Sequence, residues 1–171
     1  MDDPATDKNA TPPRWFEWAM GKMPKSRIVD VDGCPIHYLI WGSPDAGSDG
    51  LLFIHGGGAH AHWWSFIAPF FAENRPVAAI DLSGMGDSGH RTGDYGSPVH
   101  IPEIAAVIDD APLGAHPVVV GHSFGGYMIM SYAAKNGSNL SGVVIVDAAI
   151  RPGTEDRDAP RAAYDLSLIH I

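Results

Sequence analysis

The sequence predicts an α/β protein with a mostly parallel central sheet and flanking helices. From residue 51 onward, short continuous apolar runs alternate with segments of helical pattern, and such runs are typical of strands buried on both faces of a sheet. Before them lie two strand-like runs separated by Asp32-Gly33, a dipeptide typical of tight antiparallel hairpins. An antiparallel opening followed by strand–helix alternation predicts one sheet covered by helices.

Length and composition fit a single domain with a substantial core. The chain has 171 residues, 45% of them hydrophobic, and a net charge of −9 at pH 7. This acidity argues against nucleic acid and anionic membranes as partners.

Cys34 is the sole cysteine, which excludes an internal disulfide, and we interpret it as a half-buried strand residue. Because the start does not resemble a signal peptide and no apolar run approaches the ~18 residues of a membrane span, we expect a cytoplasmic protein that acts on a small molecule.

Residues 1–26 are expected to form a disordered lead and a short helix. Residues 1–13 are polar and contain three prolines, a composition typical of disorder. The stretch RWFEWAMGKMP, which starts at Arg14, concentrates aromatic side chains in one short helix that ends at Gly21. We interpret this helix as docked on the domain, with a helix that binds a membrane surface or a partner as the alternative.

Residues 27–150 are expected to form the N-terminal part of the core, with six strands. The helical pattern around Pro69 favours one continuous helix in spite of the proline. The expected elements, in chain order, are strands over 27–33, 34–42 and 51–58, a helix over 61–73, a strand over 75–84, a helix over 99–110, a strand over 116–121, a helix over 123–135 and a strand over 140–149.

The motif Gly121-His122-Ser123-Phe124-Gly125 marks a candidate nucleophile. It fits G-x-S-x-G and lies between a valine-rich strand and a predicted helix, which is where a nucleophile elbow occurs. The glycines on either side of such a serine let strand and helix approach closely around a tight, strained turn. The alternative is a serine that caps the helix.

Two backbone N–H groups are predicted to stabilise an oxyanion next to Ser123. The first belongs to Phe124, at the start of the predicted helix. The second is expected from the glycine-rich stretch HGGGAHAHWW after the strand over 51–58, because consecutive glycines let main-chain groups approach a substrate. We predict Gly57 as this donor, with Gly58 in reserve.

Three motifs together resemble the α/β-hydrolase fold superfamily: His55-Gly56-Gly57-Gly58, DLSGMGDS over 81–88 and GHSFGG over 121–126. They occur in the order typical of the superfamily and on its expected elements, over about residues 27–150. The combination is most similar to the branch of small esterases, carbon–carbon bond hydrolases and epoxide hydrolases. Because position 123 is a serine and not an aspartate, the resemblance implies an acyl-enzyme, hydrolysis of an ester or an activated carbon–carbon bond, and no cofactor or metal.

The resemblance also implies an acid and a histidine that follow the serine in the chain. Asp147, at the end of the sixth predicted strand, is a possible acid, and a structural strand-end aspartate is the alternative. The single histidine after Ser123 is His170. We expect the neighbouring His122 to point elsewhere on the turn and to be a poor base.

The last 21 residues are expected to differ in kind from the core. Residues 151–165 are polar and proline-rich, as at the start of a cap or lid insertion. Residues 166–171, LSLIHI, resemble the translation of a transposon-end adaptor used in DNA sequencing libraries. We interpret them, with His170, as non-native, and we expect a hydrolase truncated after about the sixth strand that lacks its catalytic histidine and is inactive as it stands.

Two alternative functions belong to other classes of protein. One is a non-catalytic binding protein on the same fold. The other is a nicotinamide-dependent oxidoreductase, because Gly56-x-Gly58-x-x-Ala61 fits the dinucleotide fingerprint and Asp81 ends the next strand. We instead interpret Asp81 and GMGDS as shaping a loop beside the oxyanion loop. The pair His60-x-His62 has no further ligand nearby in the sequence, so we expect no metal there.

Overall fold

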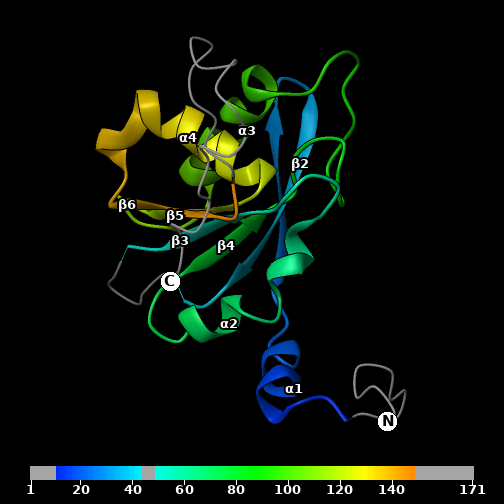
Figure 1. Cartoon of the computed structure of the whole chain (residues 1–171), viewed down its shortest axis with the longest axis vertical. Helices are drawn as coiled ribbons and strands as arrows, with labels where there is room; N and C mark the ends of the chain where they lie inside the picture. The colour runs from blue at the N-terminus through cyan, green and yellow to red at the C-terminus, as the bar shows by residue number, and fades with distance from the viewer. Residues whose placement is uncertain (1–10, 44–48, 149–171) are drawn as a thin grey trace, which may run out of the picture.

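The computed structural model describes residues 11–43 and 49–148, and its six strands form one sheet in the order β1-β2-β4-β3-β5-β6. Strands β4, β3, β5 and β6 pair in parallel, whereas β2 pairs antiparallel with both β1 and β4. The mostly parallel α/β sheet predicted from the sequence is therefore confirmed (Figure 1). The strands are β1 (Lys25–Val31), β2 (Cys34–Trp41), β3 (Leu51–Ile54), β4 (Val77–Ile80), β5 (Val118–His122) and β6 (Gly142–Val146).

The hairpin between β1 and β2 forms at the predicted dipeptide. Asp32 and Gly33 both have positive φ, at 51° and 75°, as the two central residues of a type I′ turn require. The side chain of Asp30 accepts a hydrogen bond from the Gly33 N–H at 3.0 Å. Cys34, the first residue of β2, is only 4% exposed. The prediction of a half-buried residue is therefore wrong: Cys34 is buried because it belongs to the apolar core on the α3 side of the sheet.

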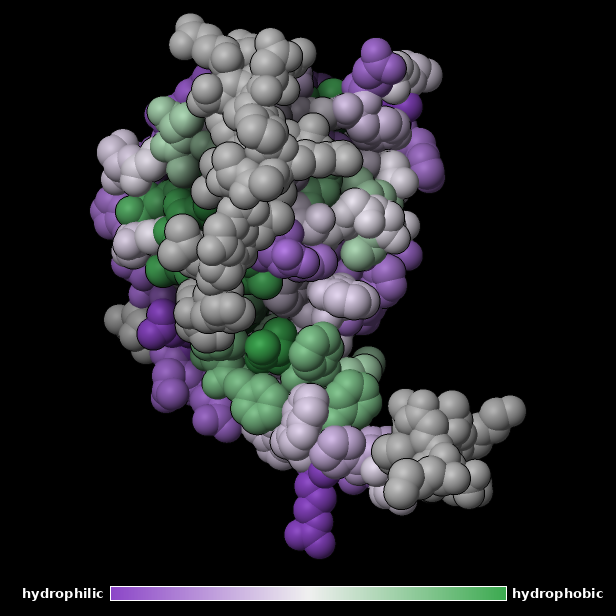
Figure 2. Space-filling model, viewed as in Figure 1, coloured by the Kyte–Doolittle hydropathy of each residue, from purple (hydrophilic) through white to green (hydrophobic). Residues whose placement is uncertain are grey.

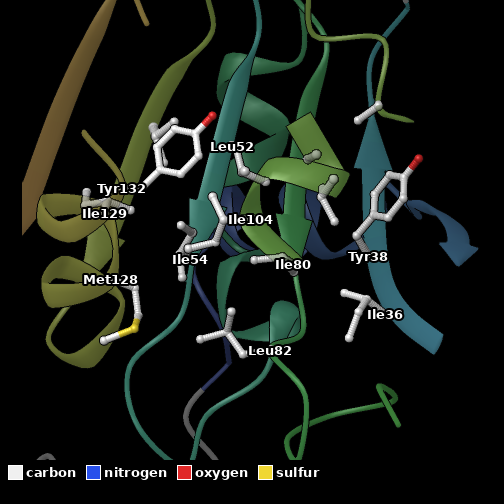
Figure 3. Packing of buried hydrophobic residues seen from close by; sticks show 14 of the residues in the cluster. Ile36, Tyr38, Leu52, Ile54, Ile80, Leu82, Ile104, Met128, Ile129 and Tyr132 are labelled. Carbon is white, nitrogen blue, oxygen red and sulfur yellow. The ribbon is translucent and has the colours of Figure 1, made fainter. Parts of the chain in front are cut away.

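Helices cover both faces of the sheet. Helices α3 and α4 pack on one face and, with the strands, enclose a large apolar cluster (Figure 3). The short helices η2 and α2 pack on the other face over a second cluster that contains Leu39, Phe53 and Trp64. The helical elements are α1 (Arg14–Met20), η2 (Ala61–Trp64), α2 (Ala68–Phe71), α3 (Ser97–Asp110), α4 (Phe124–Asn136) and η3 (Gly137–Asn139).

The predicted continuous helix over residues 61–73 is wrong. The segment forms the 3-10 helix η2 and then the four-residue helix α2, with Pro69 in the first turn of α2. Proline has no N–H to donate and clashes with the preceding turn, so it is accepted at a helix start and not inside one. The proline therefore begins a new helix rather than continuing the old one.

Several expectations fall outside the described residues. The disordered lead is described only from residue 11, and the predicted cap start, the tail and His170 lie in the segment 149–171. Within the described ranges, no helix has the length and apolar character needed to cross a membrane.

Candidate active site

Ser123 sits at a strained turn between β5 and α4. Its backbone has φ 49° and ψ −112°, a conformation that costs a non-glycine residue about 1–3 kcal/mol. Its N–H donates to the carbonyl of Val146 at the end of β6, at 2.8 Å. The turn is thus held from the neighbouring strand, and strain of this kind is typical of a functional position.

Three glycines allow this turn to be so tight. A Cβ on Gly121 would lie 2.5 Å from the carbonyl oxygen of Gly125. A Cβ on Gly125 would lie 2.6 Å from the carbonyl oxygens of Ile54, the last residue of β3, and of His55, which follows it. A Cβ on Gly126 would lie 2.6 Å from that of Ala148. All three distances are below any real Cβ contact, so helix α4 can meet the sheet here only with glycine.

The Ser123 side chain faces an open cavity of about 380 Å³. Ser123 is the N-cap residue of α4, but its side chain makes no capping hydrogen bond, so capping does not account for the hydroxyl. The cavity brings Ser123 together with the glycine-rich loop predicted from the sequence. It is lined by Gly56, Gly57, Gly58, Ala59, His60, Trp63, His122 and Ser123.

The two predicted oxyanion donors lie next to each other at this cavity. A Cβ on Gly57 would lie 3.6 Å from the Cβ of Phe124. Phe124 is the first residue of α4, and the first N–H groups of a helix have no partner inside the helix and carry its positive dipole. The geometry is compatible with an oxyanion held between the Gly57 and Phe124 N–H groups.

His55 fixes the start of the glycine-rich loop. Its Nδ1 lies 2.8 Å from the carbonyl oxygen of Gly56, and its Nε2 accepts the N–H of Leu82 at 3.1 Å. Burial lowers the pKa of His55, so the ring is neutral, with the proton on Nδ1, where the Gly56 carbonyl accepts it. His55 thus bonds within its own loop, and its contact with Leu82 ties that loop to the segment after β4.

Asp81 fixes the other end of the same loop. Its carboxylate is 1% exposed and accepts the backbone N–H groups of Ala61 and Asp87. It also lies 2.7 Å from Nδ1 of His37. The interpretation of Asp81 as a residue that shapes the loop is confirmed. Asp81 is buried and does not line the cavity at the glycine-rich loop, so the nicotinamide alternative lacks an acidic residue that could reach a ribose hydroxyl.

A metal ion has one candidate set of ligands among the described residues. The donor atoms of His37, Asp81 and Asp87 lie within 4.8 Å of one another. Both nitrogens of His37 and both oxygens of Asp81 already have hydrogen-bond partners, so these residues would have to break existing bonds to bind an ion. His60 and His62 lie with their ring centroids 6.1 Å apart on the exposed side of the loop.

The prediction that His122 points away from the site is wrong. Its ring lines the same cavity as Ser123 and stacks on Trp63, with ring centroids 6.2 Å apart. A Cβ on Gly56 would lie 2.8 Å from His122 Nδ1, so the absence of a side chain at Gly56 makes room for the ring. Trp63 is 51% exposed and Trp64 is buried against Phe53, so Trp63 is the tryptophan at the cavity.

Asp147, the possible acid, directly follows β6. It has a positive φ of 48° and an exposed side chain. The preceding Val146 carbonyl accepts the Ser123 N–H, which brings the backbone of Asp147 close to the turn. No hydrogen bond within residues 11–43 and 49–148 joins its carboxylate to a histidine, and its role as the acid stays a prediction.

A buried ionic network lies beside the turn at Ser123, and it was not predicted from the sequence. Glu103 and His100 are both fully buried, and Glu103 binds His100 Nδ1 and Arg91 Nε, each at 2.9 Å. The ring of His100 meets the ring of Phe124 edge-on, with centroids 5.6 Å apart. The His-x-x-Glu spacing on α3 was the available signal, but the third member, Arg91, comes from a separate loop.

Acid is expected to destabilise the chain through Glu103. Burial alone would raise the pKa of its carboxyl, but hydrogen bonds from His100, Ser83 and Arg91 outweigh burial and lower it. The folded pKa thus lies below the unfolded value of about 4.3, and the stabilisation is present above that pH and lost as the pH falls through the folded pKa. As the pH drops below about 4.3, the free energy of unfolding of the Glu103→Gln variant should therefore fall less than that of the wild type, as measured by urea unfolding.

The exposed Glu73 provides the matched control variant, Glu73→Gln. It replaces the same side-chain type on the surface, where no buried network is disturbed. Equal pH slopes for the wild type and the Glu103→Gln variant would show that Glu103 does not carry the acid sensitivity.

A second, larger hollow lies away from this site. It has a volume of about 440 Å³ and lies between α1, β2 and α2. Apolar side chains gather over α1 and α2 around it (Figure 2), and Trp15 and Phe70 are both about half exposed. It holds no candidate nucleophile, so we place the chemistry in the smaller cavity at Ser123.

Comparison with known proteins gives one consistent result. Residues 50–165 match the model of the α/β-hydrolase fold family. The esterase Rv0045c of Mycobacterium tuberculosis is 31% identical over 82% of this chain and 45% of its own length. A monoacylglycerol lipase of Mycolicibacterium smegmatis is 30% identical over 72% of this chain and 46% of its own length.

Solved structures agree with the sequence relatives. The thioesterase domain from the curacin biosynthetic pathway superposes with a TM-score of 0.68 at 26% identity, over 75% of this chain and 48% of that domain. A bacterial membrane phospholipase A superposes with a TM-score of 0.69 at 28% identity, over 81% of this chain and 44% of its own. The chain thus spans less than half the length of these relatives.

Proposed function

Because the chain belongs to the α/β-hydrolase fold family, we propose that it carries the nucleophile and the oxyanion hole of a serine hydrolase that acts on esters. Its relatives include esterases and lipases. The observation that carries the proposal is the strained Ser123 backbone at a glycine-lined turn, with a free hydroxyl facing the cavity and Gly57 and Phe124 beside it.

The chemistry proceeds through an acyl-enzyme. Ser123 Oγ forms a bond to the carbonyl carbon of the ester while its proton passes to a general base. The negative charge that develops on the carbonyl oxygen is held by the Gly57 and Phe124 N–H groups. The ester C–O bond then breaks, the alcohol leaves with the proton, and water hydrolyses the acyl group to regenerate the serine. Activated carbon–carbon bonds would be cleaved by the same acyl-enzyme route.

The general base is proposed to come from outside the described residues. No histidine in residues 11–43 and 49–148 hydrogen-bonds to the Ser123 hydroxyl. We keep Asp147 as a candidate acid because it follows the strand that holds the Ser123 backbone. The 171-residue chain is then expected to turn over esters very slowly or not at all, and the protein encoded by the complete gene to be active.

Covalent trapping tests this proposal. The protein from the complete gene is incubated with p-nitrophenyl butyrate, quenched in acid, digested and examined by mass spectrometry. We expect one butyryl group on the peptide that contains Ser123, and a burst of nitrophenol equal to the protein concentration. If the ester is hydrolysed with no adduct and no burst, the acyl-enzyme proposal is wrong.

The alternative on the same fold is a binding protein without catalysis. The exposed cavity at Ser123 would then hold a small molecule that is not converted. The same experiment separates the two, because a binding protein gives neither hydrolysis nor an adduct. In that case the complete gene is expected to lack a histidine that can reach Ser123.

A further inference from the structure

A second serine of the chain is hydrogen-bonded to a histidine. Ser26 lies on β1, the edge strand of the sheet, and is exposed. Its Oγ lies 2.7 Å from Nε2 of His37, on the neighbouring strand β2. Ile28 is two residues further along the same face of β1 and is 64% exposed, so an apolar side chain flanks the hydroxyl.

The histidine is in turn held by a buried carboxylate. His37 is 4% exposed, and its Nδ1 lies 2.7 Å from Oδ2 of Asp81. A carboxylate oxygen can only accept a hydrogen bond, so Nδ1 of the neutral ring carries the proton. Nε2 then has a free lone pair, and the Ser26 hydroxyl donates to it. This is the arrangement in which a histidine can take a proton from a serine.

The carboxylate is well oriented for this role. Asp81 also accepts the N–H groups of Ala61 and Asp87, and it is 1% exposed. Backbone donors hold its charge and its direction, as the third member of a serine–histidine–aspartate chain requires. Among residues 11–43 and 49–148, Ser26–His37–Asp81 is the complete hydrogen-bonded chain of this kind, whereas Ser123 has no such partner.

We propose that Ser26 is a second acylation site, which accepts acyl groups from activated esters and phosphonyl groups from fluorophosphonates. Ser26 Oγ bonds to the carbonyl carbon or to phosphorus, its proton moves to His37 Nε2, and the nitrophenolate or fluoride leaves and takes up that proton. Because Ser26 is exposed on an edge strand, the developing oxyanion is solvated by water.

The site is independent of the proposed function. Ser26 and Ser123 belong to β1 and to the end of β5, four strand spacings apart in the sheet, or about 19 Å. The reaction requires neither Ser123 nor residues outside the described part. It can therefore be tested on the 171-residue chain even if the esterase proposal fails.

The test uses the chain with Ser123→Ala, a fluorophosphonate and p-nitrophenyl acetate as probes, and peptide mass spectrometry. Ser138 and Ser141 are exposed serines that bond to Asn139 and Asp49 rather than to a histidine, so they are internal controls. We expect Ser26 to be labelled at least about tenfold faster than either, because a positioned base contributes about 10²–10⁴-fold. Labelling of Ser26 no faster than these controls overturns the proposal.

Dependence on the histidine is tested by adding His37→Gln, which can still donate to Asp81 but cannot take a proton. We expect Ser26 labelling to fall to the level of the control serines, and unchanged labelling overturns the proposal. If circular dichroism shows that this variant does not fold, Ser26→Cys replaces it. Its thiol should react with iodoacetamide at pH 6 about tenfold faster than the thiol of a Ser138→Cys variant, and equal rates overturn the proposal.

Discussion

Replacing Ser123 with alanine is expected to lower kcat for ester hydrolysis by about 10⁶-fold, because nucleophile, base and acid act as a unit and the loss of one removes the contribution of all. The measurement is hydrolysis of p-nitrophenyl butyrate by the protein from the complete gene. The backbone donors at Gly57 and Phe124 remain in the variant. We therefore expect it still to hydrolyse the ester about 10³–10⁴-fold faster than the uncatalysed reaction in water.

The matched control is Ser138→Ala, which removes an exposed hydroxyl at η3, away from the turn. It should leave kcat and KM unchanged. An S123A variant that keeps activity within tenfold of the wild type would falsify the assignment of Ser123 as the nucleophile. The activity is read from steady-state turnover, to which a single acylation of Ser26 does not contribute.

Replacing Gly125 with alanine is expected to lower the free energy of unfolding by about 3 kcal/mol. The added Cβ would lie 2.6 Å from the carbonyl oxygens of Ile54 and His55. Both are backbone atoms of a central strand and the loop that follows it, which cannot move without disturbing the sheet. Alanine has the better helix propensity by about 1 kcal/mol, but this gain is smaller than the cost of the clash. Urea unfolding of the 171-residue chain provides the measurement.

The control for this variant is Gly137→Ala. Gly137 has φ −60°, and a Cβ added to it would have no atom within 4 Å. The substitution should therefore be neutral or stabilise by about 0.4–1 kcal/mol, through the lower entropy of the unfolded chain. Equal stabilities of the Gly125→Ala and Gly137→Ala variants would contradict the close approach of α4 to β3.

Elements with strong local signals were predicted correctly. Asp32-Gly33 specifies its turn because both residues tolerate positive φ. The strands β3, β4 and β5 were recognised because buried parallel strands are continuously apolar. At Pro69 the apolar pattern continues but the helix does not, because proline has no N–H to donate and begins the new helix α2.

Side-chain partners far apart in the chain could not be predicted. Asp81 was recognised as a loop-shaping residue, but its partner His37 lies 44 residues away and meets it only because β2 pairs with β4. Arg91 reaches Glu103 from a separate loop. The direction of the His122 ring depends on Gly56, in the loop after β3, and on Trp63, in η2.

The sequence by itself determined the succession of strands and helices along the chain, and the position of the nucleophile turn with its glycines. These features depend on backbone sterics and apolar periodicity, which act over a few residues. The tertiary structure decided which side chains meet: Gly57 with Phe124, His55 with Leu82, and Ser26 with His37 and Asp81. Strand order and register set these meetings, and both follow from the packing of the whole sheet rather than from any local stretch of sequence.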